Sequence, residues 1–75
     1  MFAMADFPIV VNSLSQRELE VLSLAYEGLS VKGIADRLFV TDRTVNFHLG
    51  NVYKKFGVRK KKDAIAEAIR QGYFE

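Results

Sequence analysis

Residues 34–52 read IADRLFVTDRTVNFHLGNV, and this stretch predicts two helices joined by a tight turn. Ser30 is a good N-cap for a short helix, which we expect to end near Phe39. Thr41 can cap a longer helix, which we expect to run to about Phe56. A short helix, a tight turn and a longer helix form the helix-turn-helix pattern. Helix corners that bind no DNA share this pattern, so the pattern alone is only moderately specific.

Two further helices flank this pair. Residues 15–18 read SQRE, a capping box in which the Ser15 hydroxyl and the Glu18 carboxylate each accept a backbone N–H of the other residue. We expect this first helix to run to about Glu27, and a fourth helix to span about 61–71. The apolar positions at helical spacing are Leu19, Leu22, Ala25 and Tyr26; Ile34, Ala35 and Leu38; Val45, Leu49, Val52 and Phe56; and Ala64, Ile65, Ala68 and Ile69. The sequence therefore predicts an all-α fold, a compact four-helix domain with a central helix-turn-helix.

The length of 75 residues suits one small domain. We expect residues 1–13 to be an N-terminal arm or the remnant of a linker, and residues 14–75 to be the domain. The apolar start contains Asp6 and Pro8 and has no basic residue before them, so it does not resemble a signal peptide. No stretch approaches the roughly 20 apolar residues of a membrane span. We therefore expect a soluble, cytoplasmic protein.

The sequence gives no sign of enzymatic chemistry. It contains no cysteine, which excludes a disulfide framework and a thiolate metal site. It shows no clustered acid pair, no nucleophile beside a base and no phosphate-binding glycine loop. The single histidine, His48, has no partner ligands at helical spacing. We therefore expect a protein that is not an enzyme and uses neither a cofactor nor a metal.

The net charge of +2 conceals a strong asymmetry along the chain. Residues 1–42 carry three basic and six acidic residues, whereas residues 43–62 carry seven basic residues and no acidic one. Such an asymmetry suggests an anionic partner for one part of the surface. Charge alone is equally compatible with a solvated basic tail.

The third helix has an unusual outward face. At about 100° per residue, its apolar residues fall within one narrow sector. The opposite sector and its flanks hold Arg43, Asn46, Phe47, Gly50, Asn51 and Lys54. Phe47 is unexpected there because it is apolar. Gly50 is unexpected because a glycine inside a helix costs roughly 1 kcal/mol relative to alanine.

Contact with DNA would account for both residues. The major groove admits a helix, and there Arg43 can pair with guanine, Asn46 with adenine, and Phe47 with a thymine methyl group. Gly50 removes a side chain where the helix needs to approach the DNA closely. We therefore predict that Arg43, Asn46, Phe47 and Gly50 face the bases. The alternatives are that Phe47 packs on the arm or on another subunit, and that Gly50 marks a kink.

These residues also carry a family resemblance. The chain resembles the LuxR-type helix-turn-helix domain, which occurs in FixJ/NarL-type response regulators and in stand-alone GerE-like regulators. The resemblance covers residues 14–74 and rests on LSQRELEVL at 14–22, Gly28, Ser30, IADRL at 34–38, TVNFHLGNV at 44–52, KKFGV at 54–58, Ala64 and the terminal GYF. VNFH is closest to the quorum-sensing branch, because the response-regulator branch usually has Lys in place of Asn46. One departure is Gly33, where the family usually has the Glu of a capping box.

The resemblance implies a bacterial transcription regulator that binds double-stranded DNA, usually as a dimer, with the third helix in the major groove. Asn46, Phe47 and Gly50 match the family's main base-facing positions. The positions that tend to lie near the DNA backbone are matched by Lys32, Thr44, Lys55 and Arg59. We predict backbone contacts from these four and from Asn51, Lys54 and Lys60.

The fourth helix is the candidate dimer interface. Its apolar stripe is larger than one side of a thin domain needs, and the family resemblance indicates the same helix. We predict a homodimer through Ala64, Ile65, Ala68 and Ile69, with RNA polymerase as a further candidate partner. The main alternative function is a protein-interaction module whose basic helices dock an acidic regulatory or polymerase partner. Within the DNA-binding class, the alternative is a σ-factor-like promoter-binding domain.

Overall fold

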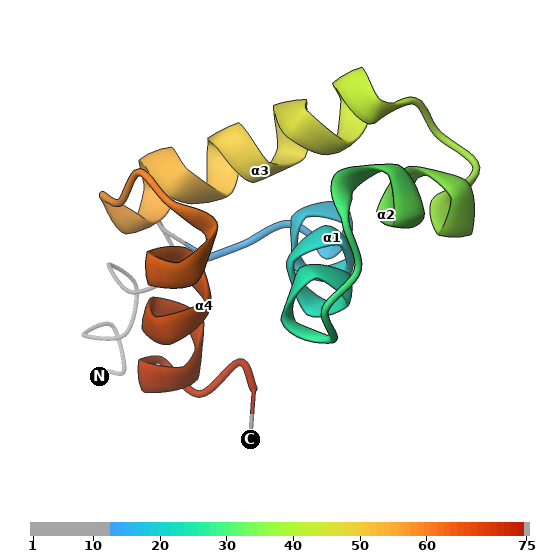
Figure 1. Cartoon of the computed structure of the whole chain (residues 1–75). Coiled ribbons are helices and arrows are strands. Elements are labelled where there is room, and N and C mark those ends of the chain that lie inside the picture. The colour runs from blue at the N-terminus through green and yellow to red at the C-terminus, as the bar shows by residue number, and fades with distance from the viewer. Residues whose placement is uncertain (1–12, 75) are drawn as a thin grey trace, which may run out of the picture.

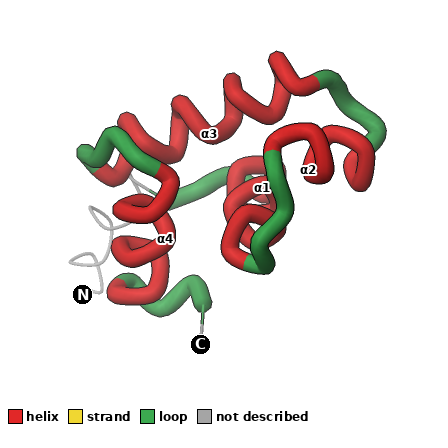
Figure 2. Tube along the Cα trace, viewed as in Figure 1, coloured by secondary structure: helices red, strands yellow, loops and turns green. Residues whose placement is uncertain are grey.

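The computed structural model describes residues 13–74 and has four helices there: α1 (Gln16–Tyr26), α2 (Val31–Leu38), α3 (Asp42–Phe56) and α4 (Lys61–Arg70) (Figure 1). Short loops join them, and no residue of the described part lies in a strand (Figure 2). The predicted all-α, four-helix fold is confirmed, with helix bounds close to those expected. Residues 1–12, most of the expected arm, lie outside the described residues.

The longest helix, α3, organises the fold. It packs against each of the other three helices, and α1 also packs against α2 and α4. In Figure 1, α3 runs across the top, with α1 and α2 beneath one part of it and α4 beneath the other end. One side of α3 is therefore covered by the other three helices, and none of the helices in residues 13–74 covers its opposite side.

Side-chain caps start three of the helices as the sequence predicts. At α1 the backbone N–H of Ser15 donates to Glu18 Oε1 at 2.9 Å, and the N–H of Glu18 donates to Ser15 Oγ at 3.1 Å, which completes the capping box. Ser30 and Thr41 each accept the backbone N–H three residues further on, both at 3.1 Å. Gly33 therefore leaves the serine half of the α2 cap intact. The start of α4, at Lys60, has no side-chain cap.

The turn between α2 and α3 begins with an uncommon backbone conformation. Phe39 is the C-cap of α2 and adopts φ 60° and ψ 44°, the left-handed region in which L-residues other than glycine are uncommon. Phe39 is also 94% exposed. The left-handed residue ends α2 where expected and turns the chain toward Thr41.

The core contains most of the predicted residues, but the prediction for α1 was partly wrong. The buried apolar residues are Val21, Leu22, Leu24, Ala25, Ile34, Ala35, Val45, Leu49, Val52, Ala64 and Ala68. Leu19 is half-buried, and Tyr26 is 46% exposed with its ring stacked on Phe74 at a centroid distance of 4.5 Å. Because α1 contacts all three other helices, its buried face is wider than a single helical stripe and includes Val21 and Leu24.

Candidate nucleic-acid interface

The outward face of α3 is exposed as the sequence predicts. Arg43, Asn46 and Lys54 are exposed, and Phe47 is 64% exposed. On the opposite side of the same helix, Val45, Leu49 and Val52 are buried in the core. The fold therefore uses one side of α3 for packing and presents the other as a surface of mixed cationic, amide and aromatic character.

Gly50 lies within this surface without a packing reason. A Cβ atom added there would meet nothing within 4 Å, and Gly50 lies inside the continuous helix from Asp42 to Phe56. Neither crowding by the described residues nor a break in α3 therefore explains the glycine. The close approach of another molecule stays the predicted explanation for Gly50.

Phe47 does not belong to the core of the described domain. Its ring makes an edge contact with the neighbouring His48, at a centroid distance of 5.5 Å, and His48 is itself half-buried. A contact of Phe47 with the arm falls outside the described residues. Most of the phenyl surface is available to a partner molecule.

The predicted backbone-contacting residues come from three parts of the fold. Lys32 is exposed on α2, while Thr44 and Asn51 are half-buried on α3. The hydroxyl of Thr44 accepts from the hydroxyl of Thr41 at 3.1 Å, within the cap of α3. Arg59 and Lys60, in the loop that follows α3, are exposed. Lys32, Arg59 and Lys60 therefore have their cationic groups at the surface, as a phosphate contact requires.

Lys55 differs from the other predicted backbone-contacting residues. Its Nζ atom lies 2.7 Å from Glu18 Oε1 and 3.2 Å from the carbonyl oxygen of Ser13. The sequence did not reveal this ion pair, because 37 residues separate the two partners. In addition, the capping box already explains Glu18, and the basic run already explains Lys55. The DNA contact of Lys55 stays a prediction, and its ammonium group has internal partners in the domain itself.

The environment of Glu18 favours its charged form. The side chain is buried, and burial acts to raise its pKa. The hydrogen bond from Lys55, the two hydrogen bonds of the capping box with Ser15 and the positive charge of Lys55 act in the opposite direction. Together they lower the pKa of Glu18 below its ordinary value.

The prediction for the dimer interface needs a correction. Ala64 and Ala68 have no exposed surface, because both pack into the core of the monomer. A residue without accessible surface cannot contribute contact area, so these two residues are wrong as interface residues. Ile65 is half-buried and Ile69 is 44% exposed, so the isoleucines are the part of the predicted interface that is available.

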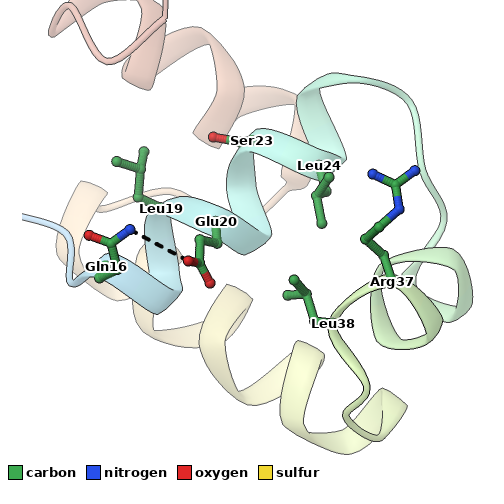
Figure 3. A pocket seen from close by; sticks show the side chains of 7 residues that line it. All are labelled: Gln16, Leu19, Glu20, Ser23, Leu24, Arg37 and Leu38. Atoms are coloured by element: carbon green, nitrogen blue, oxygen red, sulfur yellow. Dashed lines mark hydrogen bonds between the residues drawn. The ribbon is translucent and has the colours of Figure 1, made fainter.

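A pocket of about 410 Å³ lies between α1 and α2, away from the residues predicted to contact DNA (Figure 3). Leu19, Leu24 and Leu38 supply its apolar wall, and Arg37 lies at its α2 side. The pocket is open to solvent. It contains none of the predicted DNA-contacting residues, so the candidate site is the outward face of α3.

The described residues contain neither a candidate metal site nor a candidate membrane-crossing helix. Residues 13–74 contain no group of three or more histidine, cysteine or acidic side chains that could hold a metal ion. Of the helices between residues 13 and 74, none combines the length and the apolar character needed to cross a membrane.

A short helix, a turn and a longer helix whose polar side faces outward define a helix-turn-helix domain. The chain belongs to the luxR family of bacterial regulatory proteins, because the model of that family matches residues 12–68. The predicted family is thereby confirmed. Members of this family are DNA-binding transcription regulators, and this chain carries their helix-turn-helix domain.

Relatives and solved structures agree with this assignment. The chain is 37% identical over 62 residues to the spore germination protein GerE of Bacillus subtilis, and the match covers 83% of this chain and 84% of GerE. It is 48% identical over 61 residues to a protein of Mycobacterium bovis named as an HTH-type transcriptional regulator, covering 81% of this chain but only 7% of that relative. The chain thus spans only a small part of the mycobacterial relative but most of the length of GerE.

Two solved structures share the fold. The response regulator ChrA of a heme-sensing two-component system superposes with a TM-score of 0.79 at 39% identity, over 83% of this chain and 31% of that chain. The phage VqmA–DPO complex gives a TM-score of 0.78 at 30% identity, over 97% of this chain and 34% of that chain. Both support the four-helix fold.

Proposed function

We propose that this chain binds specific sequences of double-stranded DNA by placing α3 in the major groove, and that it regulates transcription in this way. The observation that carries the proposal is the exposed outward face of α3, with Arg43, Asn46, Phe47 and Gly50 on a helix whose other side is buried. The major groove is wide enough for a helix and offers a distinct pattern of donors, acceptors and methyl groups at each base pair.

The surface divides into two kinds of contact. Arg43, Asn46 and Phe47 lie in the N-terminal half of α3, the part of a recognition helix that reaches base edges. Gly50 allows the helix backbone to come close to the DNA. Contacts with phosphate and sugar set affinity more than sequence preference. We assign these contacts to Lys32, Thr44, Asn51, Lys54, Arg59 and Lys60.

The proposal is tested by selecting bound sites from a pool of random duplexes and then measuring affinity for the selected and the scrambled sequence. We expect a clear preference for the selected sequence, and binding to both that weakens steeply with salt. Equal affinity for the two duplexes would contradict sequence-specific recognition. Binding to an acidic protein but to no duplex would favour the protein-interaction alternative.

We also propose that the chain acts as a symmetric dimer on DNA, with Ile65 and Ile69 of α4 at the interface. A domain of this size presents a short recognition surface, and a second copy doubles the number of base pairs that are read. Two-fold symmetry then requires half-sites about one helical turn apart, on the order of 10 bp. RNA polymerase is a further proposed partner, because a transcription regulator alters how the polymerase uses a promoter.

A further inference from the structure

Two neighbouring lysines at the end of α3 have different surroundings. Lys54 is exposed on the outward side. Lys55 reaches back to the start of α1, where its Nζ atom is 2.7 Å from Glu18 Oε1 and 3.2 Å from the carbonyl oxygen of Ser13. The side chain of Lys55 is 32% exposed. Its ammonium group is therefore held between two acceptors that belong to the domain itself.

The carboxylate that holds Lys55 is fixed in turn. Glu18 Oε1 accepts the backbone N–H of Ser15 at 2.9 Å, and Glu18 is only 6% exposed. A buried carboxylate that loses its cation becomes an uncompensated buried charge, and this is strongly unfavourable. Moving Lys55 to a DNA phosphate would leave Glu18 in that condition.

We propose that Glu18 withholds Lys55 from DNA, so that Lys55 acts as a positioning residue and not as a phosphate contact. The pair joins the C-terminal part of α3 to the start of α1 and thereby fixes the orientation in which α3 meets the groove. This inference rests on the proposed function, and it replaces the predicted backbone contact of Lys55.

The salt dependence of DNA binding separates the two roles of Lys55. Each phosphate contact contributes roughly 0.9 to the slope of log affinity against log salt concentration. A withheld lysine contributes nothing to this slope. Neutralising both members of the pair should therefore leave the slope unchanged, whereas releasing Lys55 from Glu18 should add a contact.

The deciding variant is Glu18→Gln combined with Lys55→Met, which keeps the net charge of the chain. Glutamine also keeps the capping box with Ser15. We expect the slope of this double variant to equal that of the wild type on the selected and the scrambled duplex. Lys54→Met is the matched control, because it removes the neighbouring, exposed cation and should make the slope shallower by about 0.9.

Glu18→Gln alone gives a second, independent test. With the ion pair gone, Lys55 can reach a phosphate, so the slope should steepen by about 0.9. Because α3 is then less firmly held on α1, the ratio of affinities for the selected and the scrambled duplex should fall. A pair that only stabilised the fold would lower the melting temperature but would not steepen the slope. Each variant is measured at a temperature at which its circular dichroism shows a folded domain.

Two results would overturn the inference. One is a double variant whose slope becomes as shallow as that of Lys54→Met, and the other is a Glu18→Gln variant whose slope stays at the wild-type value. In both cases the wild type still binds DNA, so the proposed function stands. If the wild type shows no salt-dependent binding to duplex DNA, the proposed function fails, and this inference fails with it.

Discussion

Asn46 and Arg59 are both exposed, but they occupy different places relative to the recognition surface. Asn46 is near the start of α3, whereas Arg59 follows its end. We expect Asn46→Ala to cost about 1–3 kcal/mol of binding free energy on the selected duplex and to relax the choice at one base pair. Arg59→Ala should weaken binding to all sequences alike and reduce the salt slope by about one unit.

The measurement is a titration of each variant with the selected and the scrambled duplex at two or more salt concentrations. Both side chains are exposed, so neither substitution should lower the melting temperature by more than a small amount. An Asn46→Ala variant that binds both duplexes more weakly by the same factor would place Asn46 at the DNA backbone and not at a base.

Glu18 makes the stability of the domain dependent on pH. Its pKa in the folded protein is lowered below the ordinary value of 4.5, so the ion pair contributes stability above that pH. This contribution is lost as the pH falls through the lowered pKa. The difference in unfolding free energy between wild type and Glu18→Gln should be largest near neutrality and should shrink below about pH 4.5.

Urea denaturation of both proteins between about pH 7 and pH 3 checks this expectation. Because the side chain of Glu18 is buried and hydrogen-bonded, the wild type should lose stability faster than the variant on acidification. Two proteins that lose stability in parallel would show that the carboxylate of Glu18 is not the group responsible.

At the scale of the elements, Gly50 links the stability of α3 to its proposed role in DNA binding. Alanine is roughly 1 kcal/mol more favourable than glycine inside a helix, and at Gly50 the added methyl group meets no other atom within 4 Å. Gly50→Ala should therefore raise the melting temperature by about 4–8 °C, as expected for such a change in a domain of this size. It should also weaken binding to the selected duplex, because the methyl group would project toward the DNA.

Thermal unfolding and DNA titration of the same variant measure the two effects. Gly33→Ala is the matched control, since it places a methyl group in ordinary contact, 3.4 Å from Ser30 Oγ, on a helix outside the base-facing surface. It should stabilise the domain without changing sequence preference. A Gly50→Ala variant that is more stable and binds the selected duplex as tightly as the wild type would remove the close-approach explanation.

The helices could be predicted because their signals are local. Ser15, Ser30 and Thr41 cap their helices through hydrogen bonds that span only three residues, and these bonds are present in the structure. The outward face of α3 was also predictable, because helical periodicity separates it from the buried residues. Local signals therefore sufficed for the fold and for the position of the candidate DNA surface.

The missed features depend on contacts between distant parts of the chain. The pair of Lys55 with Glu18 joins α3 to α1 across 37 residues, and periodicity within one helix does not reveal it. Ala64 and Ala68 lie on the same apolar stripe of α4 as the two isoleucines. Only the packing of α4 against α1 and α3 shows that the alanines are buried in the core. Periodicity identifies an apolar stripe but does not show how much of it the monomer buries.

At the scale of the whole molecule, charge and packing divide the domain into two regions. Six of the nine acidic residues lie in residues 1–42, whereas residues 43–62 carry seven basic residues and no acidic one. In the fold, α3 carries Arg43 and Lys54 on its outward side, and the loop after it adds Arg59 and Lys60 at the surface. This separation directs an anionic partner toward one side of the molecule.

The monomer core buries part of the apolar surface of α4 and so limits the area that can contact a second copy of the chain. With Ala64 and Ala68 buried, Ile65 and Ile69 supply the available part of the predicted interface, so we expect dimerisation to be weak without DNA. On a palindromic duplex with half-sites on the order of 10 bp apart, two chains should bind cooperatively. Ile69→Glu should reduce this cooperativity about tenfold, or by ~1.4 kcal/mol, because it buries a charge in an apolar contact.

Titrations of the palindrome and of a single half-site separate this effect from a general loss of affinity. The half-site complex of Ile69→Glu should stay close to that of the wild type, since Ile69 lies on α4 and outside the DNA surface. If a single wild-type chain saturates the selected duplex and that duplex has no palindromic symmetry, the dimer is excluded and the monomer alone must supply the specificity.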